Sequence, residues 1–89
     1  MRDPQSDALP QAFIVRPHTE RVRVLDLSPS SVHIEHRMHL HPGTVCTLEL
    51  SAGAGSRNRI GKVIRCNSLL GGRLPFWYES EIEFSDGRN

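Results

Sequence analysis

The chain has 89 residues and a formal net charge of +1, from 11 Lys and Arg against 10 Asp and Glu. This length allows one domain with one small core, and the balanced charge excludes the strong positive field of proteins that bind nucleic acid or anionic lipid non-specifically. No apolar run approaches the ~18 residues of a membrane span and no secretory signal segment is present, so we expect a cytoplasmic protein without a membrane partner.

Residues 1–11 contain two prolines, alternating charges and few apolar side chains, which predicts a flexible N-terminal tail. A single folded domain is then expected over residues 12–89. Its apolar residues recur at every second position in short runs without a helical period, and this pattern is typical of half-buried strands. The six predicted strands cover residues 12–15, 21–25, 31 to about 37, 45–50, 59–66 and 76–84.

Turn-forming residues separate these runs, with Pro29 among serines after the second strand and Pro42-Gly43 before the fourth. Six short strands with such connections predict an all-β fold, a small six-stranded antiparallel β-barrel, because closure removes the edges that a small open sheet would expose. The residues predicted to form the core are Val22, Val24, Val32, Ile34, Leu48, Leu50, Ile64, Ile82 and Phe84.

Four segments taken in order resemble the PilZ domain family over nearly the whole chain from Arg21 onward. They are VLDLSPSSVHIEH, LHPGTVCTLEL, RIGKVIRC and WYESEIEF. PilZ domains are six-stranded β-barrels, and many are bacterial receptors for cyclic di-guanylate (cyclic di-GMP). The resemblance therefore implies a PilZ-like barrel in a bacterial, non-enzymatic signalling module, with cyclic di-GMP as the candidate ligand.

The family binds this ligand through Asp-x-Ser-x-x-Gly and an upstream Arg-x-x-x-Arg. By position, Asp26 and Ser28 match the Asp and Ser, and Ser31 stands at the Gly position. A carboxylate there can accept N–H donors of a guanine edge, and arginines can form paired bonds to guanine or phosphate. The upstream motif is absent; Arg16 and Arg21, five positions apart, are the candidate substitutes.

The departures from the family pattern point to weak or lost cyclic di-GMP binding. Glu81 replaces the Gly before the family's closing strand residues, and Asp26 and Ser28 are also common corner-forming residues. The alternative function is a protein-interaction adaptor on the same barrel that does not bind the nucleotide. Trp77, on the same predicted outward face as Glu79 and Glu81, marks the candidate surface for a protein partner.

Four histidines, His33, His36, His39 and His41, fall within nine residues. On a strand, His33 and His36 point to opposite faces, so we expect no metal site. The chain has no nucleophile elbow or Gly-rich phosphate loop, and we expect neither enzyme activity nor a cofactor. A nucleic-acid partner is not expected either, because the last strand is acidic where such a barrel needs a basic, aromatic face.

Overall fold

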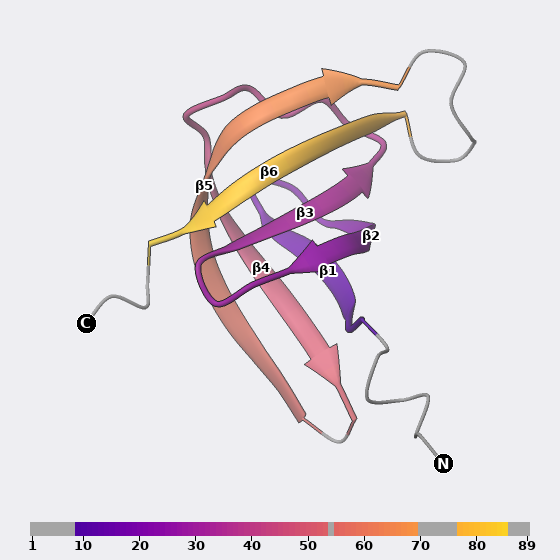
Figure 1. Ribbon diagram of the computed structural model, residues 1–89, viewed down its shortest axis with the longest axis vertical. Helices are drawn as coiled ribbons and strands as arrows, with labels where there is room; N and C mark the ends of the chain where they lie inside the picture. The colour runs from indigo at the N-terminus through magenta and orange to yellow at the C-terminus, as the bar shows by residue number, and fades with distance from the viewer. Residues whose placement is uncertain (1–8, 54, 70–76, 86–89) are drawn as a thin grey trace.

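The structure is a computed structural model of the chain, and it describes residues 9–53, 55–69 and 77–85. These residues form six β-strands and no helix (Figure 1), as the sequence predicts. Within the described ranges there is accordingly no apolar helix of membrane-spanning length. The strands are β1 (Gln11–Arg16), β2 (Glu20–Leu27), β3 (Ser31–His36), β4 (Val45–Ala52), β5 (Gly55–Ser68) and β6 (Tyr78–Phe84).

The strands close into a barrel in the order β1-β2-β3-β6-β5-β4, and every neighbouring pair is antiparallel. Two of these pairs, β1 with β4 and β3 with β6, join strands that are distant in the sequence; Figure 1 shows β3 beside β6. Because β1 pairs with both β2 and β4, the sheet has no open edge. The predicted six-stranded antiparallel barrel is confirmed.

The core occupies the interior of the barrel, where alternate residues of each strand meet. All the residues predicted for the core are buried except Ile64 and Phe84; Phe84 is partly buried and packs against it. The prediction for Ile64 is wrong, since its side chain is 43% exposed while that of Val63 is 1% exposed. The buried apolar residues are Ala12, Ile14, Val22, Val24, Val32, Ile34, Leu40, Cys46, Leu48, Leu50, Val63 and Ile82.

Gly61 sets which face of β5 points inward. A Cβ at this position would lie 2.6 Å from Cγ2 of Ile82 and 2.8 Å from the carbonyl oxygen of Glu83, so β6 approaches here as only a glycine allows. With Gly61 buried, the alternation places Val63 inside and Ile64 outside. This alternation is the physical reason for the error at Ile64.

Strand boundaries differ from the prediction chiefly in β5, which begins at Gly55 rather than at residue 59. The pairing with β4 continues through Ser51↔Ser56 and Ala52↔Gly55, so residues 55–58, which precede the predicted fifth strand, belong to β5. At the N-terminus, Gln11 already belongs to β1, and residues 1–8 of the predicted tail lie outside the described residues. Residue 76 of the last predicted strand also lies outside them.

Candidate functional site

The corner between β2 and β3 holds the Asp-x-Ser pair predicted from the sequence. Oγ of Ser28 accepts hydrogen bonds from the backbone N–H groups of Ser30 at 3.3 Å and Ser31 at 3.1 Å, and it lies 3.2 Å from Oγ of Ser31. The backbone N–H of Ser28 donates to the carbonyl oxygen of Ser31 at 2.9 Å. The Ser28 hydroxyl is therefore engaged in forming the corner itself.

Asp26 is exposed on the outer wall, by which we mean the outward faces of β2, β3 and β6. A register shift between Val24 and Asp26 places Asp26 opposite His33, which in turn lies opposite Glu81. Two strand spacings, about 10 Å, separate the backbones at Asp26 and Glu81. Two positions before His33 on β3, Ser31 lies directly opposite Glu83. Glutamates on β6 therefore share the outer wall with both motif positions.

Three basic side chains on or beside this wall lie against carboxylates. His33 Nε2 lies 2.8 Å from Oε2 of Glu79, and Arg23 Nη1 lies 3.4 Å from Oε1 of Glu35. Arg65 of β5 forms an ion pair with Glu81 of β6. These pairs leave the outer wall without a surplus of positive charge for a dianionic ligand.

The two candidate arginines lie away from the corner. Arg21 is exposed opposite Phe13 of β1, and the five positions that separate it from Asp26 correspond to about 16 Å along the strand. Arg16 is at the far end of β1, opposite Thr47 of β4. Arg21 instead lines a separate groove of about 490 Å³ with other residues of β2 and the chain before β1. The structure brings Asp26, Ser28 and Ser31 together but places neither arginine with them.

Trp77 immediately precedes β6, and its side chain is 48% exposed. Its backbone N–H donates to the carbonyl oxygen of His36 at 3.0 Å, and its carbonyl oxygen accepts from the N–H of Leu69 at 2.8 Å. The guanidinium carbon of Arg37 lies 5.9 Å from the ring centroid, and the neighbouring Met38 is 54% exposed. The backbone of Trp77 is thus held on both sides while its indole ring remains accessible.

His36 and Ser80 form a buried polar pair that the sequence did not reveal. Nδ1 of His36 lies 2.7 Å from the carbonyl oxygen of Met38, so this nitrogen carries the proton and donates. Nε2 then accepts from the hydroxyl of Ser80 at 2.7 Å. Burial lowers the pKa of His36, chiefly by desolvating its charged form. The ring stacks on Tyr78, so His36 is a core residue rather than a surface histidine.

The predicted split of the histidine cluster is confirmed, since His33 lies on the outer wall and His36 in the core. The rings of His39 and His41 contact each other edge to face, with centroids 4.9 Å apart. In the part of the chain that the structure describes, no three His, Cys, Asp or Glu side chains are grouped to hold a metal ion.

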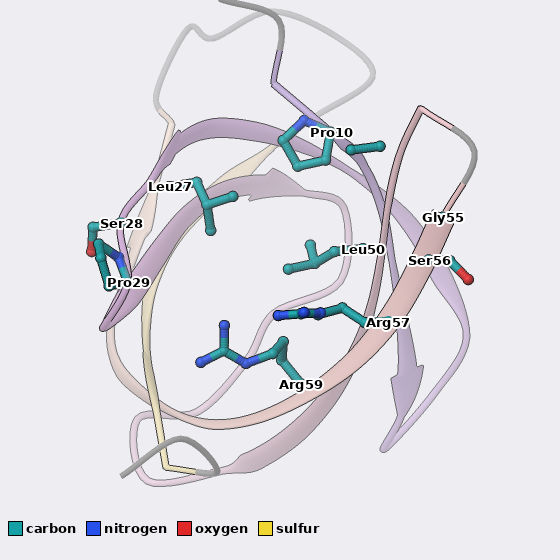
Figure 2. Close-up of a pocket in the computed structure, with 10 residues that line it drawn as sticks. Pro10, Leu27, Ser28, Pro29, Leu50, Gly55, Ser56, Arg57 and Arg59 are labelled. Atoms are coloured by element: carbon teal, nitrogen blue, oxygen red, sulfur yellow. The ribbon is translucent and has the colours of Figure 1, made fainter. Parts of the chain in front are cut away.

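A cavity of about 650 Å³ opens at one end of the barrel, between the β2–β3 corner and the β4–β5 hairpin. We call it the barrel mouth (Figure 2). It was not predicted from the sequence, although the alternation of residues 57, 59, 61 and 63 on β5 could have indicated two inward arginines. Its lining includes Pro10, Leu27 and Ser28 on one side and Leu50, Arg57 and Arg59 on the other.

Comparison with known proteins gives no match for this chain among family models, curated proteins or solved structures.

Proposed function

We propose that this chain is a cytoplasmic, non-enzymatic signalling module of the bacterial PilZ type whose binding of cyclic di-GMP is weak or lost. The proposal rests on the resemblance of four ordered segments and is consistent with a closed barrel of six antiparallel strands. The observation that carries the loss of binding is the outer wall, where Asp26 and Ser31 share rows with Glu81 and Glu83.

The expected loss of affinity follows from the missing arginines. Charge-assisted hydrogen bonds contribute about 1.5–3 kcal/mol each, so losing two weakens binding by roughly two to four decades. Ser28 should contribute little to the affinity for cyclic di-GMP, because its hydroxyl already forms hydrogen bonds within the corner. Asp26 remains exposed and can still accept the N–H groups of a guanine edge. The chain therefore keeps the guanine-facing half of the family's ligand site and lacks the phosphate-facing half.

Isothermal calorimetry with cyclic di-GMP at low salt tests this proposal. We expect no heat, or binding only at millimolar ligand. Micromolar binding that disappears in both Asp26→Ala and Arg21→Ala would refute it, because a rearranged arginine would then complete the site. Arg57→Ala, which removes an arginine outside the outer wall, serves as the control for a general loss of positive charge.

A second function, a protein-interaction adaptor, is favoured by the exposure of Trp77. Tryptophan is enriched among the residues that dominate binding energy at protein interfaces. Arg37 lies over its ring, and Met38, the next residue after Arg37, is also an exposed apolar side chain. Glu79 and Glu81 follow Trp77 on the outward face of β6. This arrangement suits a partner with an apolar anchor and basic residues around it.

The adaptor function is tested by co-purification from the native host with three forms of the chain. We expect a partner retained by the wild type to be lost with Trp77→Ala. It should be kept with Val45→Ala, which alters another exposed apolar residue, 58% exposed, on β4. Equal retention by both variants would exclude Trp77 as the anchor.

A further inference from the structure

Two arginines of β5 point into the barrel rather than away from it. Arg57 is paired with Leu50 and Arg59 with Leu48 in the register with β4, and both leucines are buried. Directly opposed residues of an antiparallel pair lie on the same face of the sheet, so the arginines face inward. Figure 2 shows both guanidinium groups extending from β5 toward the centre of the opening.

The Arg59 guanidinium is positioned by an aromatic ring. Its central carbon lies 3.8 Å from the ring centroid of Phe84, which packs against the core. A cation over an aromatic face at this distance is attracted by the ring, so the contact restrains the guanidinium within the barrel mouth. Arg57 forms no ion pair with the residues that the structure describes.

The rest of the barrel mouth is apolar or uncharged. Leu27 and Leu50 project into the opening, and Pro10 lies at its edge (Figure 2). None of the described residues that line it is acidic. The two guanidinium groups lie in a concave, largely apolar setting, where low-dielectric walls screen charge less than water does.

The size of the barrel mouth fits a small molecule. Its volume of about 650 Å³ falls within the range of roughly 300–1,000 Å³ found for ligand pockets, which are mostly apolar with a few converging polar groups. Arginine is suited to carboxylates and phosphates, since its planar fork matches two oxygens at once. An apolar body would cover the leucines while an anionic head reaches the guanidinium groups.

We propose that the barrel mouth binds a small organic anion whose carboxylate or phosphate head lies between Arg57 and Arg59 and whose apolar body packs on Leu27 and Leu50. This site is separate from the outer wall and uses neither Asp26 nor the candidate arginines of the cyclic di-GMP site. It stands whether or not that nucleotide binds. The competing explanation is that the arginine stems only cover the end of the core, as long cationic side chains often do.

Backbone-amide NMR titration with three ligands of one shape separates these explanations: 2-naphthoate, 2-naphthyl phosphate and the neutral 2-naphthamide. We expect both anions to shift the amide signals of Leu27, Ser56 and Arg57. At least one anion should bind about tenfold or more tightly than the amide, because the anions form charge-assisted hydrogen bonds with the arginines and the neutral amide does not. The tighter of the two anions identifies the preferred head group. This comparison needs no variant, so it does not depend on how well a variant folds.

Two variants with the same change of charge complete the test. Arg57→Gln should lower the affinity for the more tightly bound anion about tenfold or more. Lys62→Gln, on the exposed face of the same strand, should change that affinity less than about twofold. The spectrum of each variant also reports whether the barrel is intact. Equal binding of the amide, equal weakening by both variants, shifts confined to the outer wall, or no shift at millimolar ligand would each overturn the proposal.

Discussion

The hydroxyl of Ser80 donates a 2.7 Å hydrogen bond to Nε2 of His36 inside the barrel, and both side chains are buried. The bond joins β6 to β3, two strands separated by 44 positions at these residues. Nδ1 of His36 donates to the carbonyl oxygen of Met38, so Nε2 of the neutral ring is the acceptor for the Ser80 hydroxyl, and burial disfavours the charged ring. A neutral buried histidine makes the stability of the barrel depend on pH.

The lowered pKa of His36 predicts that acid destabilises the protein. Below the ordinary histidine pKa of about 6.5, the unfolded chain binds a proton that folded His36 does not, so the free energy of unfolding falls as pH drops. Above that value the contribution is fully present. Urea unfolding at pH 7.5 and at pH 5 measures the change. The loss of unfolding free energy between the two pH values should be smaller in His36→Gln than in the wild type, and the same as in the wild type in the exposed His41→Gln. Identical pH dependence in the wild type and both variants would contradict the prediction.

Ser80→Ala should destabilise the barrel by about 1–3 kcal/mol, because it leaves the buried Nε2 of His36 without a donor. The exposed Ser68→Ala on β5 is the matched control and should change the free energy of unfolding by less than about 0.5 kcal/mol. Chemical denaturation of both variants at pH 7.5 provides the comparison. A loss no larger in Ser80→Ala than in Ser68→Ala would mean that the bond contributes nothing to stability.

A pair of isoleucines tests the strand register. Ile34→Ala should cost about 2–5 kcal/mol, since the Ile34 side chain is fully buried and its removal leaves a cavity. Ile64→Ala should change stability by less than about 0.5 kcal/mol, because its side chain is 43% exposed. Thermal melting monitored by circular dichroism compares the two. Similar losses for both variants would show that β5 faces the other way.

Two glycines of β5 form another matched pair. In Gly61→Ala the new methyl group would meet Ile82 and the backbone of Glu83, so we expect a loss of about 1–3 kcal/mol from overpacking. Gly55→Ala introduces a methyl group with no atom within 4 Å and should be nearly neutral. Melting temperatures of the two variants measure this difference. An unaltered Gly61→Ala would mean that β6 can move aside without cost.

The acidic outer wall predicts a gain of cyclic di-GMP affinity when Glu81 is neutralised. Glu81→Gln removes a negative charge and releases Arg65 from its ion pair, so the nucleotide should bind a few-fold more tightly. Glu49→Gln on β4 changes the net charge equally, away from the outer wall, and should have little effect. Calorimetry at low salt compares both with the wild type. Equal gains would point to net charge alone.

The sequence predicts the barrel well because period-two apolar runs and turn residues are local signals. It fails at Ile64 because the inward frame of β5 is set by Gly61, whose packing against β6 leaves no mark in the pattern of apolar residues. Arg57 and Arg59 were not predicted to face inward because charged side chains are normally assigned to the surface; their register with buried leucines shows that they face inward.

The candidate site also has a part that the sequence predicts and a part that it does not. Asp26, Ser28 and Ser31 lie within one corner, and their closeness follows from six consecutive residues. Whether Arg21 could join them depends on how far it lies along β2 and on the β1–β2 pairing, which a motif cannot reveal. His36 looked like a member of a histidine cluster because its partner, Ser80, comes from a distant strand.

Closure of the barrel has a consequence for how the chain folds. Ala12 of β1 pairs with Leu50 of β4, which comes 38 positions later in the sequence. The β1-β2-β3 unit therefore cannot complete its strand pairing until both β4 and β6 have been synthesised. During synthesis this N-terminal meander therefore has two bare edges, one on β1 and one on β3. Contacts between strands so far apart slow folding and leave such edges open to pairing with other chains. The nascent chain is thus most exposed to misassembly before its last strand emerges.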